Sequence, residues 1–142
     1  MKYYDDFQMD EVFISRGRTI TETDLINFCM FSGDWYYLHS DKEKAGESVF
    51  GERIAHGLLV LSATSGLMPV NEMAIVAFYG MDKVRFLAPT KIGDTLHLEI
   101  KVLEKKDKGD MGGVVTFESK VKNQKGEDAA LSILKIFMAK KN

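Results

Sequence analysis

A nearly continuous run of apolar and small residues, 57–68, constrains the fold of this chain more than any other segment. The run reads GLLVLSATSGLM, and Pro69 follows it directly. It is too short for a membrane span, which needs about 18 uncharged apolar residues, but it suffices for about three turns of helix. A helix that is apolar on all sides must be buried on all sides. We therefore predict a helix over residues 57–68, ended by Pro69, at the centre of the fold.

The second half of the chain has the pattern of β-strands. Apolar residues at positions 96, 98, 100 and 102 alternate with polar ones, which is the period of a half-buried strand. The remaining predicted strands cover residues 74–79, 83–87, 114–121 and 129–137, with a hairpin turn, NQKG, between the last two. Successive strands joined by polar turns favour an antiparallel sheet. The fold class is therefore α+β, with one domain over residues 1–142 whose antiparallel sheet curls around the apolar helix.

The first half of the chain carries shorter elements. β-Branched residues predict a strand over residues 13–20. Thr21 is a suitable N-cap and Gly33 a suitable C-cap for a helix over residues 22–32. The aromatic segment that follows, residues 34–41, is predicted to be a loop.

Charge and cysteine content exclude several classes of partner and site. The 19 basic and 21 acidic residues leave a net charge of -2, so nothing indicates the concentrated basic face that nucleic acid or an anionic membrane requires. Cys29 is the only cysteine, which leaves no internal disulfide and is compatible with a reducing cytoplasm. Residues 1–10 lack the basic-then-apolar order of a signal peptide. We expect a cytoplasmic protein without a membrane span and without a nucleic-acid partner.

Three histidines are candidates for chemistry. His97 lies on the polar face of an alternating strand and is predicted to be a solvated surface residue. His56 directly precedes the apolar helix, where it can hydrogen-bond locally. His39 differs, because Asp34 lies five residues before it in a segment otherwise filled with aromatic residues. A carboxylate and an imidazole held together in such surroundings have coupled, shifted pKa values, although most such pairs lie on surfaces by chance.

Other kinds of site lack the residues they need. No two histidines stand at helical metal-ligand spacing, and Cys29 has no cysteine partner for a zinc site, so no metal is expected. Ser62 and Ser65 lie outside a Gly-x-Ser-x-Gly elbow. The glycines form neither a dinucleotide fingerprint nor a phosphate loop.

Two separated motifs resemble a known family. The sequences SGDWYYLHSD at 32–41 and FGERIAHGLL at 50–59 resemble the hydratase signature of the MaoC-like family, the (R)-specific enoyl-CoA hydratase group of hot-dog proteins. Downstream, VRFLAP at 84–89 and IGDT at 92–95 resemble the segment Phe-x-x-Pro-x-x-x-Gly-Asp of that family. The resemblance implies a hot-dog fold and a homodimer or higher homo-oligomer with acyl-thioester sites near the subunit interface.

The same resemblance implies roles for individual residues. Asp34 and His39 match the catalytic dyad, and Gly57 matches the glycine whose backbone N–H binds the thioester carbonyl. Ser65 matches a serine that lines the site, and His56 is expected to shape the pocket without transferring a proton. The family's usual Asn-Pro is replaced here by two tyrosines. Of these, Tyr36 is expected to narrow the pocket or to contribute its own hydroxyl, and the missing proline leaves the loop less stiff.

The implied activity is reversible addition of water across the C2=C3 bond of a 2-enoyl thioester. The expected substrate is an enoyl-CoA, which gives a 3-hydroxyacyl-CoA, and no cofactor is expected. The alternatives are a 3-hydroxyacyl-carrier-protein dehydratase, a hot-dog thioesterase and a non-catalytic acyl-CoA-binding protein. A carrier protein needs a basic patch, which Lys42, Lys44 and Arg53 can form, although Glu43 and Glu47 dilute it. Acyl-chain length and the physiological direction stay open.

Overall fold

One sheet and one central helix organise the molecule. The computed structural model describes residues 1–141 and is mixed α+β, with six strands in the described part. The strands are β1 (Val12–Ile14), β2 (Arg18–Thr19), β3 (Ile75–Phe86), β4 (Thr95–Asp107), β5 (Gly112–Lys122) and β6 (Asp128–Ala139). The helices are α1 (Glu22–Ser32), α2 (Tyr37–Ser40), α3 (Lys42–Gly46) and α4 (Gly57–Ser65), with 3-10 turns at Tyr4–Asp6 and Val70–Glu72.

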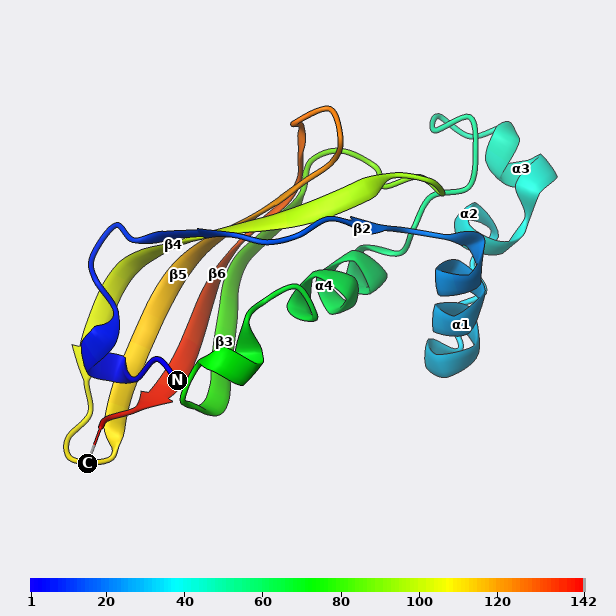
Figure 1. The fold of residues 1–142 in the computed structure, drawn as a ribbon. Helices are drawn as coiled ribbons and strands as arrows, with labels where there is room; N and C mark the ends of the chain where they lie inside the picture. The colour runs from blue at the N-terminus through cyan, green and yellow to red at the C-terminus, as the bar shows by residue number, and fades with distance from the viewer. Residues whose placement is uncertain (142) are drawn as a thin grey trace.

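The sheet is antiparallel throughout and curves around α4, as predicted. Its strand order is β1-β4-β5-β6-β3, and β2 also pairs with β4. In Figure 1, α4 lies under the concave face of the sheet, while α1, α2 and α3 gather beyond the end of the sheet that is nearer the start of α4. Alternate residues of the strands point into this concave face, so the core lies between sheet and helix.

The central helix differs from its prediction in two respects. It ends at Ser65, three residues before the predicted end, and the chain continues through Leu67 and Met68, which are still buried. One face of α4 is open, because Leu58 is 66% exposed and Ser62 on the next turn is also exposed. The expectation that every side is buried is therefore wrong for the single chain. An exposed helix face beside buried ones follows from a sheet that covers α4 on one side only.

Helix α1 has the predicted bounds and caps. The side chain of Thr21 accepts a hydrogen bond from the N–H of Asp24 at 3.2 Å, and the Asp24 carboxylate accepts one from the N–H of Thr21 at 2.8 Å. Gly33 closes the helix with φ 77°, and its N–H donates to the carbonyl of Cys29. This left-handed conformation suits glycine. It turns the chain sharply, so that residue 34 leaves the helix toward α2.

Three local predictions require correction. The predicted strand 13–20 is split into β1 and β2. The two predicted strands 74–79 and 83–87 form the single strand β3, which contains register shifts against β6. The aromatic segment 34–41 contains the short helix α2 where a loop was predicted. Among the described residues, no helix is long and apolar enough to cross a membrane.

Candidate active site

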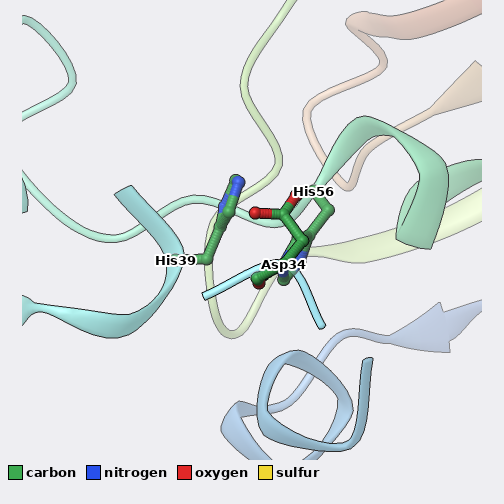
Figure 2. A group of neighbouring side chains, drawn as sticks. All are labelled: Asp34, His39 and His56. Atoms are coloured by element: carbon green, nitrogen blue, oxygen red, sulfur yellow. The ribbon is translucent and has the colours of Figure 1, made fainter. Parts of the chain in front are cut away.

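Asp34, His39 and His56 come together beside the start of α4. One side-chain atom from each, a carboxylate oxygen or a ring nitrogen, lies within 4.8 Å of the others. Asp34 comes from the turn after α1, His39 from α2, and His56 from the residue before α4. Figure 2 shows the carboxylate of Asp34 turned toward His39. Two hydrogen-bonding atoms this close can both contact one water molecule, because each such bond spans about 2.8 Å.

The position of His39 fixes which of its ring nitrogens can act as a base. The ring is 9% exposed, and Nδ1 lies 2.8 Å from the carbonyl oxygen of Ile54. A carbonyl oxygen can only accept a hydrogen bond, so Nδ1 carries the proton. In the neutral ring Nε2 then holds the lone pair. A backbone contact therefore selects the tautomer whose basic nitrogen is Nε2.

His56 is buried and connects both members of the pair. Its Nε2 lies 3.0 Å from the backbone carbonyl oxygen of Asp34 and therefore donates to it, and its ring stacks on His39 with centroids 3.7 Å apart. Phe28 packs on His56, and the thiol of Cys29 lies 3.5 Å from Nε2. The other nitrogen, Nδ1, is buried without a hydrogen-bond partner among the described residues.

The surroundings of His56 keep it neutral. Burial lowers its pKa, and the neighbouring His39 adds to the effect, although the contact with Asp34 opposes it. Protonation would also place a second N–H at Nδ1, where no acceptor is available in the described chain. His56 is therefore suited to holding its neighbours and unsuited to proton transfer.

The backbone of Asp34 is held while its carboxylate stays accessible. The N–H of Asp34 donates to the hydroxyl of Ser32 at 3.1 Å, and Oδ1 accepts the N–H of Tyr36 at 3.1 Å. Oδ2 has no hydrogen-bond partner within residues 1–141, and the residue is exposed. This oxygen is free to bind water or substrate.

Gly57 and His39 line the same cavity. It has a volume of about 410 Å³ and is mostly apolar, with walls from the start of α4, from the end of β3 and from the segment 87–90. The N–H of Gly57 belongs to the first turn of α4 and makes no backbone hydrogen bond in the described chain. A Cβ at Gly57 would lie 2.7 Å from the ring of Phe86, so a larger residue here requires that ring to move.

The other predicted residues lie farther away. Tyr36 is 55% exposed, and its ring centroid is 6.3 Å from that of His39, so it stands at the rim. Ser65 lies at the far end of α4, about 12 Å from Gly57 by the helical rise, and lines a different cavity. His97 is on β4, where it contacts Glu99. The functional roles assigned to these residues and to the dyad stay predictions.

Several contacts within the site could not be predicted from the sequence. The Ile54 carbonyl that orients His39 is a backbone atom, so no side-chain pattern reveals it. Phe86 lies inside the matched downstream motif, but nothing in the sequence placed its ring against Gly57. Helical spacing from Leu25 marks Cys29 as a buried residue, and its contact with His56 depends on the fold.

The donor set does not fit a metal ion. His39 uses Nδ1 and His56 uses Nε2 to donate hydrogen bonds to carbonyl oxygens. The remaining nitrogen of His56 is buried. Only Nε2 of His39 and the carboxylate of Asp34 are left, which is fewer than the three or four protein ligands that zinc takes.

Comparison with known proteins matches both the sequence and the fold. The family model of the MaoC like domain matches residues 6–124. Protein MaoC of Klebsiella aerogenes is 41% identical over 70% of this chain, which spans only 30% of that relative's length. An (R)-specific enoyl-CoA hydratase of Rhodospirillum rubrum is 30% identical, with 72% of this chain and 70% of the relative covered.

Solved structures agree with the architecture. A monoamine oxidase regulatory protein from Archaeoglobus has a TM-score of 0.92 and 36% identity, with 99% of this chain and 95% of that chain covered. A Mycobacterium tuberculosis protein with a double hotdog fold has a TM-score of 0.88 at 17% identity, covering 98% of this chain and 44% of that one. The described chain therefore has the hot-dog fold.

Proposed function

Since the chain belongs to the MaoC-like domain family, we propose that it adds water reversibly across the C2=C3 bond of a 2-enoyl-CoA. The relative named (R)-specific enoyl-CoA hydratase supports this reaction class. The observation that carries the proposal is the convergence of the Asp34 carboxylate with a His39 ring whose Nδ1 proton is held by a carbonyl.

The dyad supplies a base and an acid for hydration. A water molecule bound between Nε2 of His39 and Oδ2 of Asp34 gives a proton to Nε2, and its oxygen bonds to C3. The electron pair of the double bond moves toward the thioester carbonyl, and a proton from the dyad then goes to C2. Because both additions come from one side, the expected stereochemistry is syn. The carbonyl of Ile54 stabilises the protonated ring, since its hydrogen bond strengthens when His39 becomes charged.

The start of α4 supplies the stabilising donor for the thioester oxygen. In the transition state this oxygen gains negative charge, which the unpaired N–H of Gly57 and the helix dipole both favour. One preorganised donor of this kind contributes about 3 kcal/mol in comparable sites. That Gly57 and His39 line one cavity supports a carbonyl bound beside the base.

Charges around α3 favour coenzyme A over a carrier protein. Arg53 is paired with Glu22, and Lys91 with Glu52, so neither adds to a broad basic patch. The two lysines of α3, Lys42 and Lys44, remain and suit the phosphates of a nucleotide-type carrier.

We also propose that two copies pair through β3. Within residues 1–141 this strand has a neighbour on one side only, β6. It exposes large apolar side chains: Val76, Phe78, Tyr79 and Phe86. An unpaired edge with exposed apolar residues is a template for association. Sedimentation velocity of the wild type and of Tyr79→Lys tests this, with the variant expected to become monomeric.

The reaction is tested by loss of the enoyl absorbance of crotonyl-CoA. The wild type is compared with Asp34→Asn and His39→Gln, with Thr23→Ala, which removes an exposed hydroxyl of α1, as the control. We expect the two dyad variants to lose about 10²- to 10⁴-fold in kcat, while the control keeps its activity. Activity that survives in both dyad variants would contradict the assignment. Release of free thiol from a saturated acyl-CoA would instead identify a thioesterase.

A further inference from the structure

Two serines interrupt the apolar surface that the sheet presents to α4. Along β5 and β6, residues at alternate positions face the core and are apolar: Val115, Phe117, Val121, Ala130, Leu134 and Ile136. In the same rows stand Ser119 and Ser132, which are direct partners across the two strands. They are 4% and 5% exposed. Hydroxyls at such positions normally have partners, because burying an unpaired polar group is costly.

Neither hydroxyl has a hydrogen-bond partner within the part of the chain that the structure describes. Among residues 1–141, Ser119 and Ser132 make no side-chain hydrogen bond. Neither Oγ is completely inaccessible to solvent. Both residues line a cavity of about 310 Å³ between the sheet and α4. The two Oγ–H groups are therefore free donors in residues that line this cavity, whose walls are otherwise mainly apolar.

Helix α4 also contributes residues to the wall of this cavity. Ser62 and Ser65 lie there, and each donates its hydroxyl proton to a carbonyl of its own helix. Their oxygens can only accept further hydrogen bonds. Free donors of the sheet and acceptors of the helix thus line one cavity, where a ligand oxygen or hydroxyl could pair with them.

This cavity and the one that His39 lines occupy successive positions along α4. The first cavity lies between residues 57–60 of α4, Phe86 of β3 and Ala129. The second lies between residues 61–65, Met81 of β3 and Ser132. The two linings share no residue, but both include side chains of α4, β3 and β6. By the helical rise, Ser62 is about 8 Å beyond Gly57.

From this arrangement we propose that the acyl chain of the substrate carries an oxygen, bound by Ser119 and Ser132. The inference rests on the proposed function, which places the thioester at Gly57 and directs the acyl chain along α4. A small number of placed polar groups in an apolar cavity is the usual basis of ligand specificity. A plain alkyl chain would leave both serine donors buried and unpaired, so the site discriminates against it.

The test uses saturated acyl-CoA thioesters, which cannot be hydrated. Octanoyl-CoA is compared by titration calorimetry with analogues that carry a hydroxyl on successive carbons beyond C3. We expect one analogue to bind the wild type about tenfold more tightly than octanoyl-CoA. Ser119→Ala and Ser132→Ala each reduce that ratio about fivefold. Ser48→Ala, the same change in a turn outside both cavities, leaves it unchanged.

The outcomes distinguish a failure of this inference from a failure of the proposed hydration reaction. Octanoyl-CoA binding as tightly as every hydroxylated analogue overturns the inference, whether or not crotonyl-CoA is hydrated. A preference that the two serine variants retain overturns it as well, and means that the serines bind only water. A serine-dependent preference without turnover of any enoyl-CoA supports the inference and refutes the reaction. The hydroxyl scan on the wild type needs no variant to fold.

Discussion

Replacing His56 tests whether the site depends on a buried, neutral histidine. Two substitutions form a matched pair. In His56→Gln the side-chain NH₂ reaches as far as Nε2 and can still donate to the carbonyl of Asp34, whereas the shorter side chain of His56→Asn cannot. Both variants lose the stacking on His39, which contributes about 1 kcal/mol. Only the asparagine variant also loses the 3.0 Å hydrogen bond, at a further cost of about 1 kcal/mol.

The free energy of unfolding in urea and kcat with crotonyl-CoA measure the two effects separately. We expect the asparagine variant to be about 1 kcal/mol less stable than the glutamine variant. Its kcat should be lower by up to about 10²-fold, because a released Asp34 misplaces its carboxylate relative to His39. Equal stability and equal kcat in the two variants would show that the contact between His56 and Asp34 does not position the dyad. Both variants retain His39, so the catalytic base is the same in both and does not contribute to the difference between them.

Three further predictions concern other parts of the molecule. Gly57→Ala places a Cβ 2.7 Å from Phe86. It should lower the free energy of unfolding by about 1 to 3 kcal/mol. Combining it with Phe86→Leu should restore part of this stability. If stability is not restored, the Phe86 ring is not the obstacle. Because burial lowers the pKa of His56, the folded state resists protonation of this ring, and stability should fall as the pH drops through its ordinary value of 6.5. Thermal unfolding between about pH 5 and 8 should show this fall in the wild type and not in His56→Gln, and parallel curves would contradict it. The double variant of Ser119→Ala and Ser132→Ala should be about 1 kcal/mol more stable than the wild type in urea, whereas a loss of stability would indicate partners for these hydroxyls within the fold.

The sequence predicts those parts of the fold that depend on local chemistry. Helix α1 has its predicted bounds because Thr21 and Gly33 satisfy its ends by contacts within the same segment. Strand β3 was divided in the prediction because Gly80 and Asp82 break the apolar pattern, whereas the ladder with β6 accommodates this segment through register shifts. Pairing between distant strands supplies what the local pattern lacks.

In the site, too, local sequence predicts some features and long-range contacts determine the others. The motif that carries Asp34 and His39 indicates the pair, and the fold brings them together with His56. The proton on Nδ1 of His39 could not be predicted, because it depends on a carbonyl fifteen residues away. The sequence does indicate the serine pair in the core, since Ser119 and Ser132 occupy positions where the alternation of each strand predicts an apolar residue.

Residues 54–57 contribute to the site in a way that bears on how this protein tolerates sequence change. Within four positions the chain provides the carbonyl for His39 from Ile54, the stacked ring of His56 and the N–H of Gly57. Two of these three are main-chain groups, which any side chain at position 54 would still present. In a deep mutational scan, position 54 should therefore accept many amino acids of similar size. A deletion or insertion of one residue between Ile54 and Gly57 should abolish activity in every background, because the spacing along the main chain, more than side-chain identity, sets the distance between base and oxyanion donor.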